Sequence, residues 1–277
     1  MTGAAADPIA KTLRTLDRER YYATLILPET ERAAVQALYA AVAEIAAVGE
    51  RVREPMAGEI RLTWWAELLG GKRRDEAEQN PVALALIETM ARHRLPAQPL
   101  INLIEARRFD LYGDPMPDVD RFEGYAGETV SVPLQLAATI LNHGTPPADG
   151  DAAGHLGVAL ALFGHLRAFG FNAARGKLFL PLSLFAEHGV THGDILGRKD
   201  SPALRAALAS CRAFGAAHLA KARASLKSMP RAIRPAFAQI AVIDARARPV
   251  ADPFAPTEPR ADWLTLLRLM WFGATRT

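Results

Sequence analysis

The chain has 277 residues, of which half are hydrophobic and 23% are charged, and its formal net charge is +3. These values are typical of a globular protein that can bury a sizeable core. Positive charges are spread along the chain and not gathered in one basic tract, so nothing in the composition indicates nucleic-acid binding. The single cysteine, Cys211, cannot form an intramolecular disulfide and belongs to no zinc motif, which fits a reducing compartment.

No segment of the sequence predicts export or insertion into a membrane. Residues 1–8 are small and acidic, unlike a secretory signal with its basic start and apolar run. The most apolar stretches, 130–141 and 156–163, are shorter than the roughly 20 residues that cross a bilayer, so we interpret them as buried helices. We expect a bacterial cytoplasmic protein that is at most peripheral to the inner membrane.

Apolar residues recur at helical spacing in nearly every long segment, and Ala and Leu prevail where strands would favour Val, Ile and Thr. The sequence therefore predicts an all-α fold. The expected helices cover residues 11–26, 31–52, 57–70, 81–93, 97–112, 119–142, 152–170, 202–226, 231–248 and 258–273. The helical period fades over 171–198, where we expect an extended loop. We assign residues 1–277 to one domain, with a Pro-rich connection at 249–259 before the last helix.

Several short patterns follow one another across most of the chain. They are DRERYY at 17–22, LP at 27–28, Arg32, ALYA at 37–40, LTWW at 62–65, EARRFDL at 105–111, Tyr125 with ET at 128–129, RGKLFLP at 175–181, HGV at 188–190 and HLAKAR at 218–223. Each is weak alone, but the ordered set is specific and resembles the squalene/phytoene synthase family. The resemblance implies a single antiparallel helical bundle of the isoprenoid synthase type around an apolar cavity.

In catalytic members of that family, two acidic motifs face each other across the cavity mouth. A prenyl diphosphate brings several negative charges into a partly dry cleft, and Mg²⁺ ions must neutralise them. Magnesium prefers carboxylate and water oxygens in octahedral geometry. Aspartates at positions i and i+4 of a helix lie on one face and can share such ions.

The resemblance places other residues where those aspartates would stand. In the first motif the aspartate pair is replaced by Ala46 and Ala47, and Glu50 stands at the last position. In the second motif the two positions hold Ala168 and Asn172. A methyl group offers no oxygen to a metal, so we expect no magnesium cluster, no other cofactor and no catalytic residue. This pattern favours a protein that is not an enzyme.

Two stretches, 125–131 and 175–181, resemble a divergent branch of the family that includes mitochondrial complex I assembly factor 6 and its bacterial relatives, which also lack the acidic motifs. The resemblance implies a helper in assembling NADH:quinone oxidoreductase, with a protein partner, a prenyl or acyl lipid held in the cavity, or both. Arg175 and Lys177 are candidates for binding a phosphate or lipid head group, because guanidinium presents a planar fork to such anions. Ordinary salt bridges that pin the loop explain the two residues equally well.

Two further functions stay open. One is an active head-to-head prenyltransferase whose Mg²⁺ ligands have moved to Glu44, Glu50, Glu105 and Asp110. Glu105 and Asp110 are five residues apart with two arginines between them, so an ion-paired or solvated surface is favoured over a metal site there. The other is a plain lipid carrier. The seven histidines, including His155, are not expected to bind a metal.

Two aromatic segments have structural interpretations. For the adjacent pair Trp64 and Trp65, we expect one ring to point into the core and the other to cover an edge. The terminal helix around 263–272 is apolar on most faces and contains Arg268. It suits either a packed last helix of the bundle, which we favour, or a helix at a membrane interface, where Trp and Arg are favoured.

Overall fold

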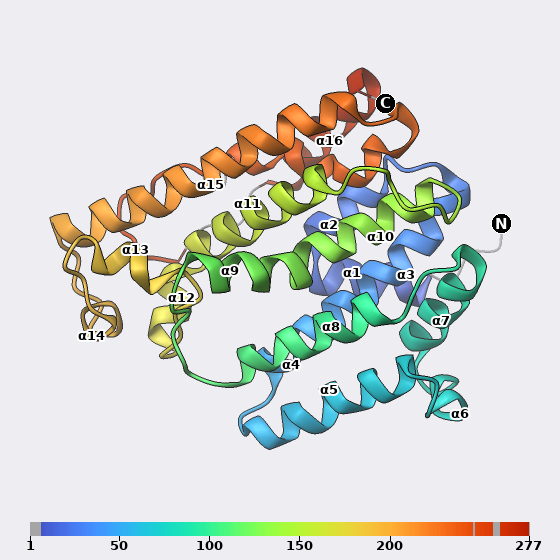
Figure 1. The fold of residues 1–277 in the computed structure, drawn as a ribbon, viewed down its shortest axis with the longest axis horizontal. Helices are drawn as coiled ribbons and strands as arrows, with labels where there is room; N and C mark the ends of the chain where they lie inside the picture. The colour runs from blue at the N-terminus through green and yellow to red at the C-terminus, as the bar shows by residue number, and fades with distance from the viewer. Residues whose placement is uncertain (1–6, 246, 257–260, 277) are drawn as a thin grey trace.

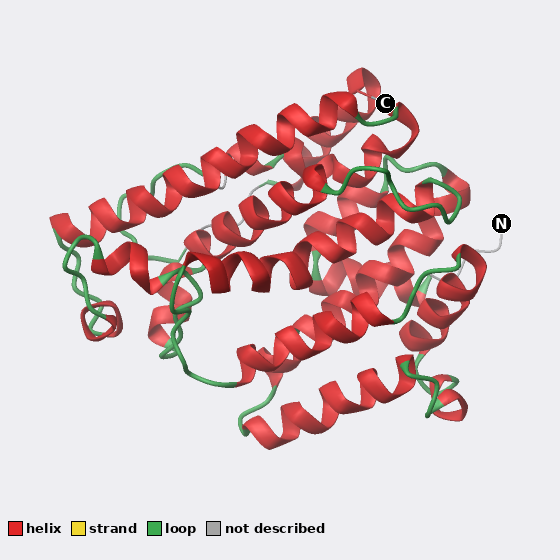
Figure 2. Cartoon of the chain, in the orientation of Figure 1, coloured by secondary structure: helices red, strands yellow, loops and turns green. Residues whose placement is uncertain are grey.

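A computed structural model describes residues 7–245, 247–256 and 261–276. Over these residues it contains helices and loops and no strand, which confirms the all-α prediction (Figure 2). The α-helices are α1 (Pro8–Leu16), α2 (Arg18–Thr24), α3 (Glu29–Ala46), α4 (Val48–Arg51), α5 (Pro55–Leu69), α6 (Arg74–Ala77), α7 (Pro81–His93), α8 (Gln98–Arg107), α9 (Val119–Ala126), α10 (Val132–Leu141), α11 (Asp151–Arg167), α12 (Phe169–Ala174), α13 (Leu182–Ala186), α14 (His192–Leu196), α15 (Pro202–Ser228) and α16 (Asp262–Arg276). Four other helical segments are η1 (Arg108–Leu111), the π-helix η2 (Gly127–Ser131), η3 (Arg231–Ala241) and η4 (Ile243–Ala245).

The helices form a bundle in which α3 is central. Residues 34–43 of α3 are all buried, and this helix packs against α1, α7 and α10. The long helices α11 and α15 lie side by side, and α5 packs against α8 at the opposite edge (Figure 1). Cys211 of α15 is fully buried, and burial raises the pKa of its thiol to about 12. The tryptophan prediction is confirmed, because Trp65 is buried while Trp64 is half-buried and donates to Glu76 at 2.7 Å.

Among the described residues, one helical stretch is long and apolar enough to cross a membrane by length and composition alone. It covers Glu29–Arg51, that is α3 and α4 taken together, and its most apolar window has a mean hydropathy of 1.3. Since 67% of that window is buried inside the fold, it has the character of a core helix. The prediction that 130–141 and 156–163 are buried helices is confirmed, because most residues of both stretches are inaccessible in α10 and α11.

The expected helices at 11–26 and 31–52 are each broken once. Asp17 has a non-helical backbone (φ −142°, ψ 80°), and its side chain accepts a hydrogen bond from the Arg20 backbone N–H at 2.9 Å. It therefore ends α1 and caps α2, a role for which Asp is favoured. Ala47 separates α3 from the single turn α4. Apolar periodicity continues through both breaks, so it could not reveal them.

The extended loop expected over 171–198 is wrong in part. Residues 175–180 are non-helical as predicted, but the short helices α12, α13 and α14 occupy much of the remainder. The last of these begins with a capping box, in which the Thr191 hydroxyl accepts from the Asp194 N–H and the Asp194 carboxylate accepts from the Thr191 N–H. Helices of one or two turns are too short to show an apolar period.

The expected helix at 231–248 is also different. It is mostly a 3₁₀ segment, η3, because Pro235 inside it lacks the N–H that an α-helix requires, and Phe237 departs from helical angles (φ −100°, ψ 17°). The short helix α6 was not predicted. The expected start of the last helix at 258, and the end of the Pro-rich connection, lie outside the described residues.

The segment 119–141 is continuous, as predicted, but contains the π-helical turn η2. At its end, the Ser131 hydroxyl donates to the Gly154 carbonyl of α11 at 3.2 Å. A Cβ atom added at Gly157 would lie 2.7 Å from the Ser131 backbone nitrogen, so only glycine permits this approach. A Cβ atom added at Gly154 would meet nothing within 4 Å. Packing of η2 on α11 therefore requires a glycine at position 157 but not at position 154.

We expect Gly157→Ala to lower the free energy of unfolding by about 1–3 kcal/mol, because the added methyl displaces the η2 backbone. Gly154→Ala is the matched control, and we expect it to raise that free energy by up to about 1 kcal/mol through helix propensity. Urea unfolding followed by circular dichroism measures both. Equal effects of the two substitutions would contradict the close packing of η2 on α11.

Candidate functional site

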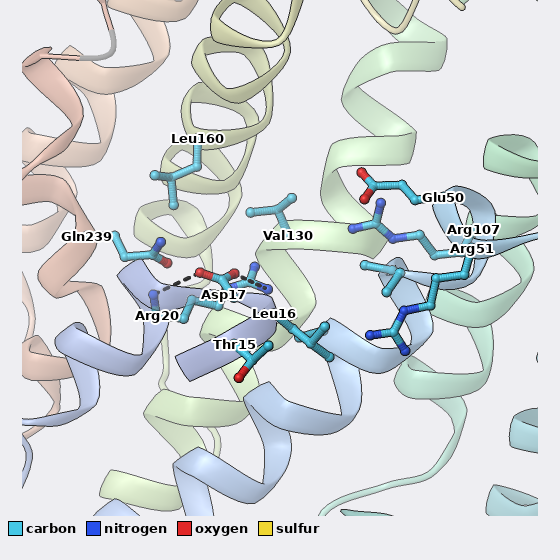
Figure 3. Close-up of a pocket in the computed structure, with 13 residues that line it drawn as sticks. Thr15, Leu16, Asp17, Arg20, Glu50, Arg51, Arg107, Val130, Leu160 and Gln239 are labelled. Carbon is cyan, nitrogen blue, oxygen red and sulfur yellow. Dashed lines mark hydrogen bonds and ion pairs between the residues drawn. The ribbon is translucent and has the colours of Figure 1, made fainter. Parts of the chain in front are cut away.

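A cavity of about 410 Å³ lies beside the carboxyl end of α3, where the family resemblance places the first acidic motif (Figure 3). Ala46 and Ala47 line it, and so does Glu50. Its other charged or amide side chains are Asp17, Arg20, Arg51, Arg107 and Gln239. Arg20 and Gln239 lie at one side and Glu50, Arg51 and Arg107 at the other (Figure 3). The structure therefore joins the first-motif positions to side chains from α1–α2, α8 and η3.

The charged lining differs from the apolar cavity that the resemblance implied. Three guanidinium groups and two carboxylates line the walls. Of these groups, Arg20 pairs with Asp17, and Arg107 pairs with Asp110 behind the wall, so charged pairs occupy space that an apolar chain would need. Nowhere along the described ranges do three or more His, Cys, Asp or Glu side chains gather in a way that could hold a metal ion.

Arg20 forms one wall of the cavity. The residue is only 7% exposed, its Nη1 atom lies 3.6 Å from the Asp17 carboxylate, and its guanidinium stacks 5.3 Å from the Tyr39 ring centre. Burial raises the pKa of Tyr39 to about 12, and the nearby arginine opposes that rise. Arg20, near the capped start of α2, is thus held in place by the Asp17 carboxylate and the Tyr39 ring.

Arg107 forms the other wall and belongs to a buried network of three side chains. Its Nη1 atom donates to Asp110 Oδ2 at 2.9 Å and to the Tyr125 hydroxyl at 2.8 Å. The Tyr125 hydroxyl donates to Asp110 Oδ1 at 2.6 Å. Each carboxylate oxygen of Asp110 therefore accepts one hydrogen bond, and the Arg107 guanidinium already offsets its negative charge.

The four carboxylates considered as displaced magnesium ligands do not converge. Only Glu50 lines the cavity. Glu44 accepts from Asn80 at 3.5 Å, and burial raises the pKa of its carboxyl group. Glu105 pairs with Arg108 at 2.7 Å on the surface. The ion-pair interpretation of Glu105 and Asp110 is confirmed, although Asp110 is buried and not at a solvated surface.

The second-motif positions lie close to the site without lining it. Ala168 is the residue between α11 and α12. The Asn172 carbonyl accepts from the backbone N–H groups of Arg175 and Lys177, at 2.9 Å each, and so shapes the turn that follows. Neither Ala168 nor the Asn172 side chain is among the groups that form the cavity wall.

The turn after α12 reaches the cavity mouth. Arg175 Nη2 lies 3.5 Å from the Glu50 carbonyl, and its guanidinium stacks over Phe171. Lys177 Nζ donates to the Asp110 carbonyl, and burial lowers the pKa of its amine. Arg175 and Lys177 thus contact backbone carbonyls of α4 and η1. These contacts favour a role in holding the loop in place over a role in binding a phosphate or lipid head group.

The two histidines that contact each other are far apart in the sequence. His155 lies with its Nδ1 atom 3.1 Å from Nδ1 of His218, and His218 Nε2 lies 3.0 Å from the Glu123 carboxylate. These three side chains line a second cavity of about 530 Å³. His188 contacts Ser210 at 2.8 Å. No sequence signal links His155 to His218, because the two are 63 residues apart.

Most of the charged and amide side chains that line the cavity were not predicted from the sequence. Arg51, Arg107 and Gln239 come from three separate elements that meet only in the fold. Asp17 and Arg20 did carry a local signal, since they stand three apart at the start of a helix, the spacing of a side-chain cap.

The chain matches the family model described as squalene/phytoene synthase over residues 13–261. It is 32% identical to human NADH dehydrogenase (ubiquinone) complex I, assembly factor 6, over 82% of this chain and 68% of that protein. It is 28% identical to a 15-cis-phytoene synthase of Synechococcus elongatus, over 63% of this chain and 60% of that protein. The crystal structure of a squalene synthase from Alicyclobacillus acidocaldarius superposes with a TM-score of 0.71 at 19% identity, covering 86% and 90% of the two chains, which supports the predicted isoprenoid synthase fold.

His165 makes the stability of the fold sensitive to acid. Its ring stacks 4.7 Å from Phe179, and burial together with Arg107 lowers its pKa from 6.5 to about 3. The unfolded chain therefore binds a proton between pH 6.5 and 3 that the folded chain does not, so stability falls as pH falls through this window.

We expect His165→Gln to reduce the slope of unfolding free energy against pH between pH 6.5 and 3, by at most about 1.4 kcal/mol per pH unit. His143→Gln is the control, because that side chain is 85% exposed. Urea unfolding at a series of pH values measures the slope. An unchanged slope in His165→Gln would contradict the assignment.

Proposed function

The chain belongs to the squalene/phytoene synthase family, and from this premise we propose that it is a non-catalytic factor in the assembly of a respiratory NADH:quinone oxidoreductase. Support comes from the human relative, whose name is that of a complex I assembly factor. The phytoene synthase relative matches a smaller part of the chain. The family membership and the fold agree with the sequence-based predictions.

The observation that carries this proposal is the composition of the cavity mouth. Catalysis by the family's chemistry needs several carboxylates to hold Mg²⁺ against a diphosphate. Here the mouth contains Ala46 and Ala47, and Glu50 is the carboxylate that remains beside them. Asp17, the other carboxylate that lines the cavity, lies 3.6 Å from Arg20, and Asp110 is held by Arg107 and Tyr125. In this proposal the helical bundle binds a protein partner and performs no catalysis.

The proposed factor acts in the cytoplasm, at the surface of the inner membrane, and its partner is a protein of the respiratory complex. It uses no metal or other cofactor. A prenyl or acyl lipid in the cavity beside α3 is the less favoured ligand, because charged side chains line the walls. The competing function, a prenyltransferase with displaced Mg²⁺ ligands, requires Asp110 to bind a cation although Arg107 already offsets its charge.

Deletion of the gene tests the proposal directly. We expect membrane NADH oxidation to fall while hopanoid and carotenoid contents stay unchanged. Complementation with the wild-type gene and with Glu50→Gln is expected to restore NADH oxidation equally, because the carboxylate has no metal to bind. Loss of the lipids with intact NADH oxidation would instead assign the chain to prenyl transfer.

Isothermal titration with Mg²⁺ and a farnesyl diphosphate analogue separates the two functions in the purified protein. We expect no saturable binding that depends on Mg²⁺, because too few carboxylates reach the cavity. Saturable, Mg²⁺-dependent binding that Glu50→Gln abolishes would favour the prenyltransferase. Glu88→Gln is the matched control, since it makes the same change at an exposed carboxylate of α7 that neither hypothesis uses.

A further inference from the structure

The terminal helix α16 is attached to the bundle by one face only. Leu269 and Phe272 are buried, and the helix packs on η3 and α2 (Figure 1). The remaining faces carry five exposed large apolar side chains, which are Trp263, Leu264, Leu267, Met270 and Trp271. Trp263 is 60% exposed and Trp271 is 73% exposed. The packed helix that we expected therefore also presents an apolar surface, here called the tryptophan face.

Acidic charge is absent from the tryptophan face. Asp262 is the one acidic residue in the sequence of α16, and it lies 3.4 Å from Arg18. The remaining ionisable residues in the sequence of the helix are Arg268 and Arg276. Of the two segments on which the helix packs, η3 adds two arginines and no acidic residue, and α2 adds Arg18, Arg20 and the acidic Glu19. This end of the bundle thus combines exposed tryptophan with excess positive charge.

We infer that the tryptophan face docks on an anionic lipid surface. Tryptophan and arginine are favoured at the boundary between headgroups and acyl chains, and a helix with one apolar face lies in that plane. The positive charge complements anionic headgroups. This inference deepens the proposed function by naming the surface that brings the factor to the membrane.

A second copy of the chain suits this surface less well. The strip from Trp263 to Trp271 is about 12 Å long, given the rise of an α-helix. A stable protein interface takes roughly 800 Å² and 20–30 residues from each partner, more than one helix face supplies. The strip is also an outward face of a single helix, with its anchor residues Leu269 and Phe272 on the opposite side.

Co-sedimentation with vesicles tests the inference on the full chain. We expect the protein to bind phosphatidylcholine vesicles that contain phosphatidylglycerol, and to bind pure phosphatidylcholine more weakly. Trp263→Gln with Trp271→Gln is expected to weaken binding at least about tenfold. Arg268→Gln should weaken binding only to the anionic vesicles. Met56→Gln with Ile60→Gln, an equally exposed apolar pair on α5, is the matched control and should bind as the wild type does.

A second measurement guards against misfolded variants. Trp263→Phe with Trp271→Phe keeps the apolar face, so this variant should bind vesicles but lose quenching of its fluorescence by spin-labelled lipid. The inference is overturned if the wild type does not bind, if the Gln variant binds unchanged, or if the wild type is a dimer that the Gln variant makes monomeric. Vesicle binding and membrane NADH oxidation are separate readouts, so failure of the docking surface is distinguishable from failure of the assembly role.

Discussion

The buried network of Arg107, Asp110 and Tyr125 fixes the geometry of the whole site. It ties the end of α8 and η1 to α9, and it uses both oxygens of the carboxylate. The turn α4 approaches so closely that a Cβ atom at Gly49 would lie 2.9 Å from Asp110 Cβ. Removing one partner of such a pair typically costs 3–5 kcal/mol, because a buried charge is left uncompensated. The cavity walls therefore depend on these three side chains staying together.

The same network limits the chemistry that the cavity can support. A carboxylate that satisfies an arginine and a tyrosine cannot also neutralise a cation at low cost. The mouth of the cavity has backbone carbonyls of Glu50 and Asp110 that accept from Arg175 and Lys177. Cations of the protein thus stand near the place where the family's catalytic members would hold magnesium. A shared fold with a different set of charges is compatible with a different function.

Periodicity predicted the long helices well and the breaks poorly. The helix α7 begins and ends where the apolar period indicates, and the segment 119–141 is continuous as expected. The break at Asp17 depends on one side-chain cap, and the 3₁₀ segment η3 depends on Pro235. Such single-residue causes leave the surrounding hydrophobic pattern unchanged, so a reading based on that pattern passes over them.

The candidate site was only partly predictable for a related reason. The alanines at 46 and 47 were placed through the family resemblance, and the structure puts them at the cavity. The charged wall depends on contacts between distant segments, such as Arg175 with the Glu50 carbonyl, 125 residues apart. Local spacing carries no information about such contacts, and composition gives only the number of arginines.

The burial of Cys211 has a practical consequence. Only the thiolate form of cysteine reacts readily with alkylating reagents and oxidants, and this thiol is both inaccessible and held protonated in the middle of α15. In the native fold this thiol is therefore protected from such reagents. Any labelling of the Cys211 thiol reports that α15 has separated from the segments that cover it. The thiol is therefore a built-in chemical probe of local unfolding around α15.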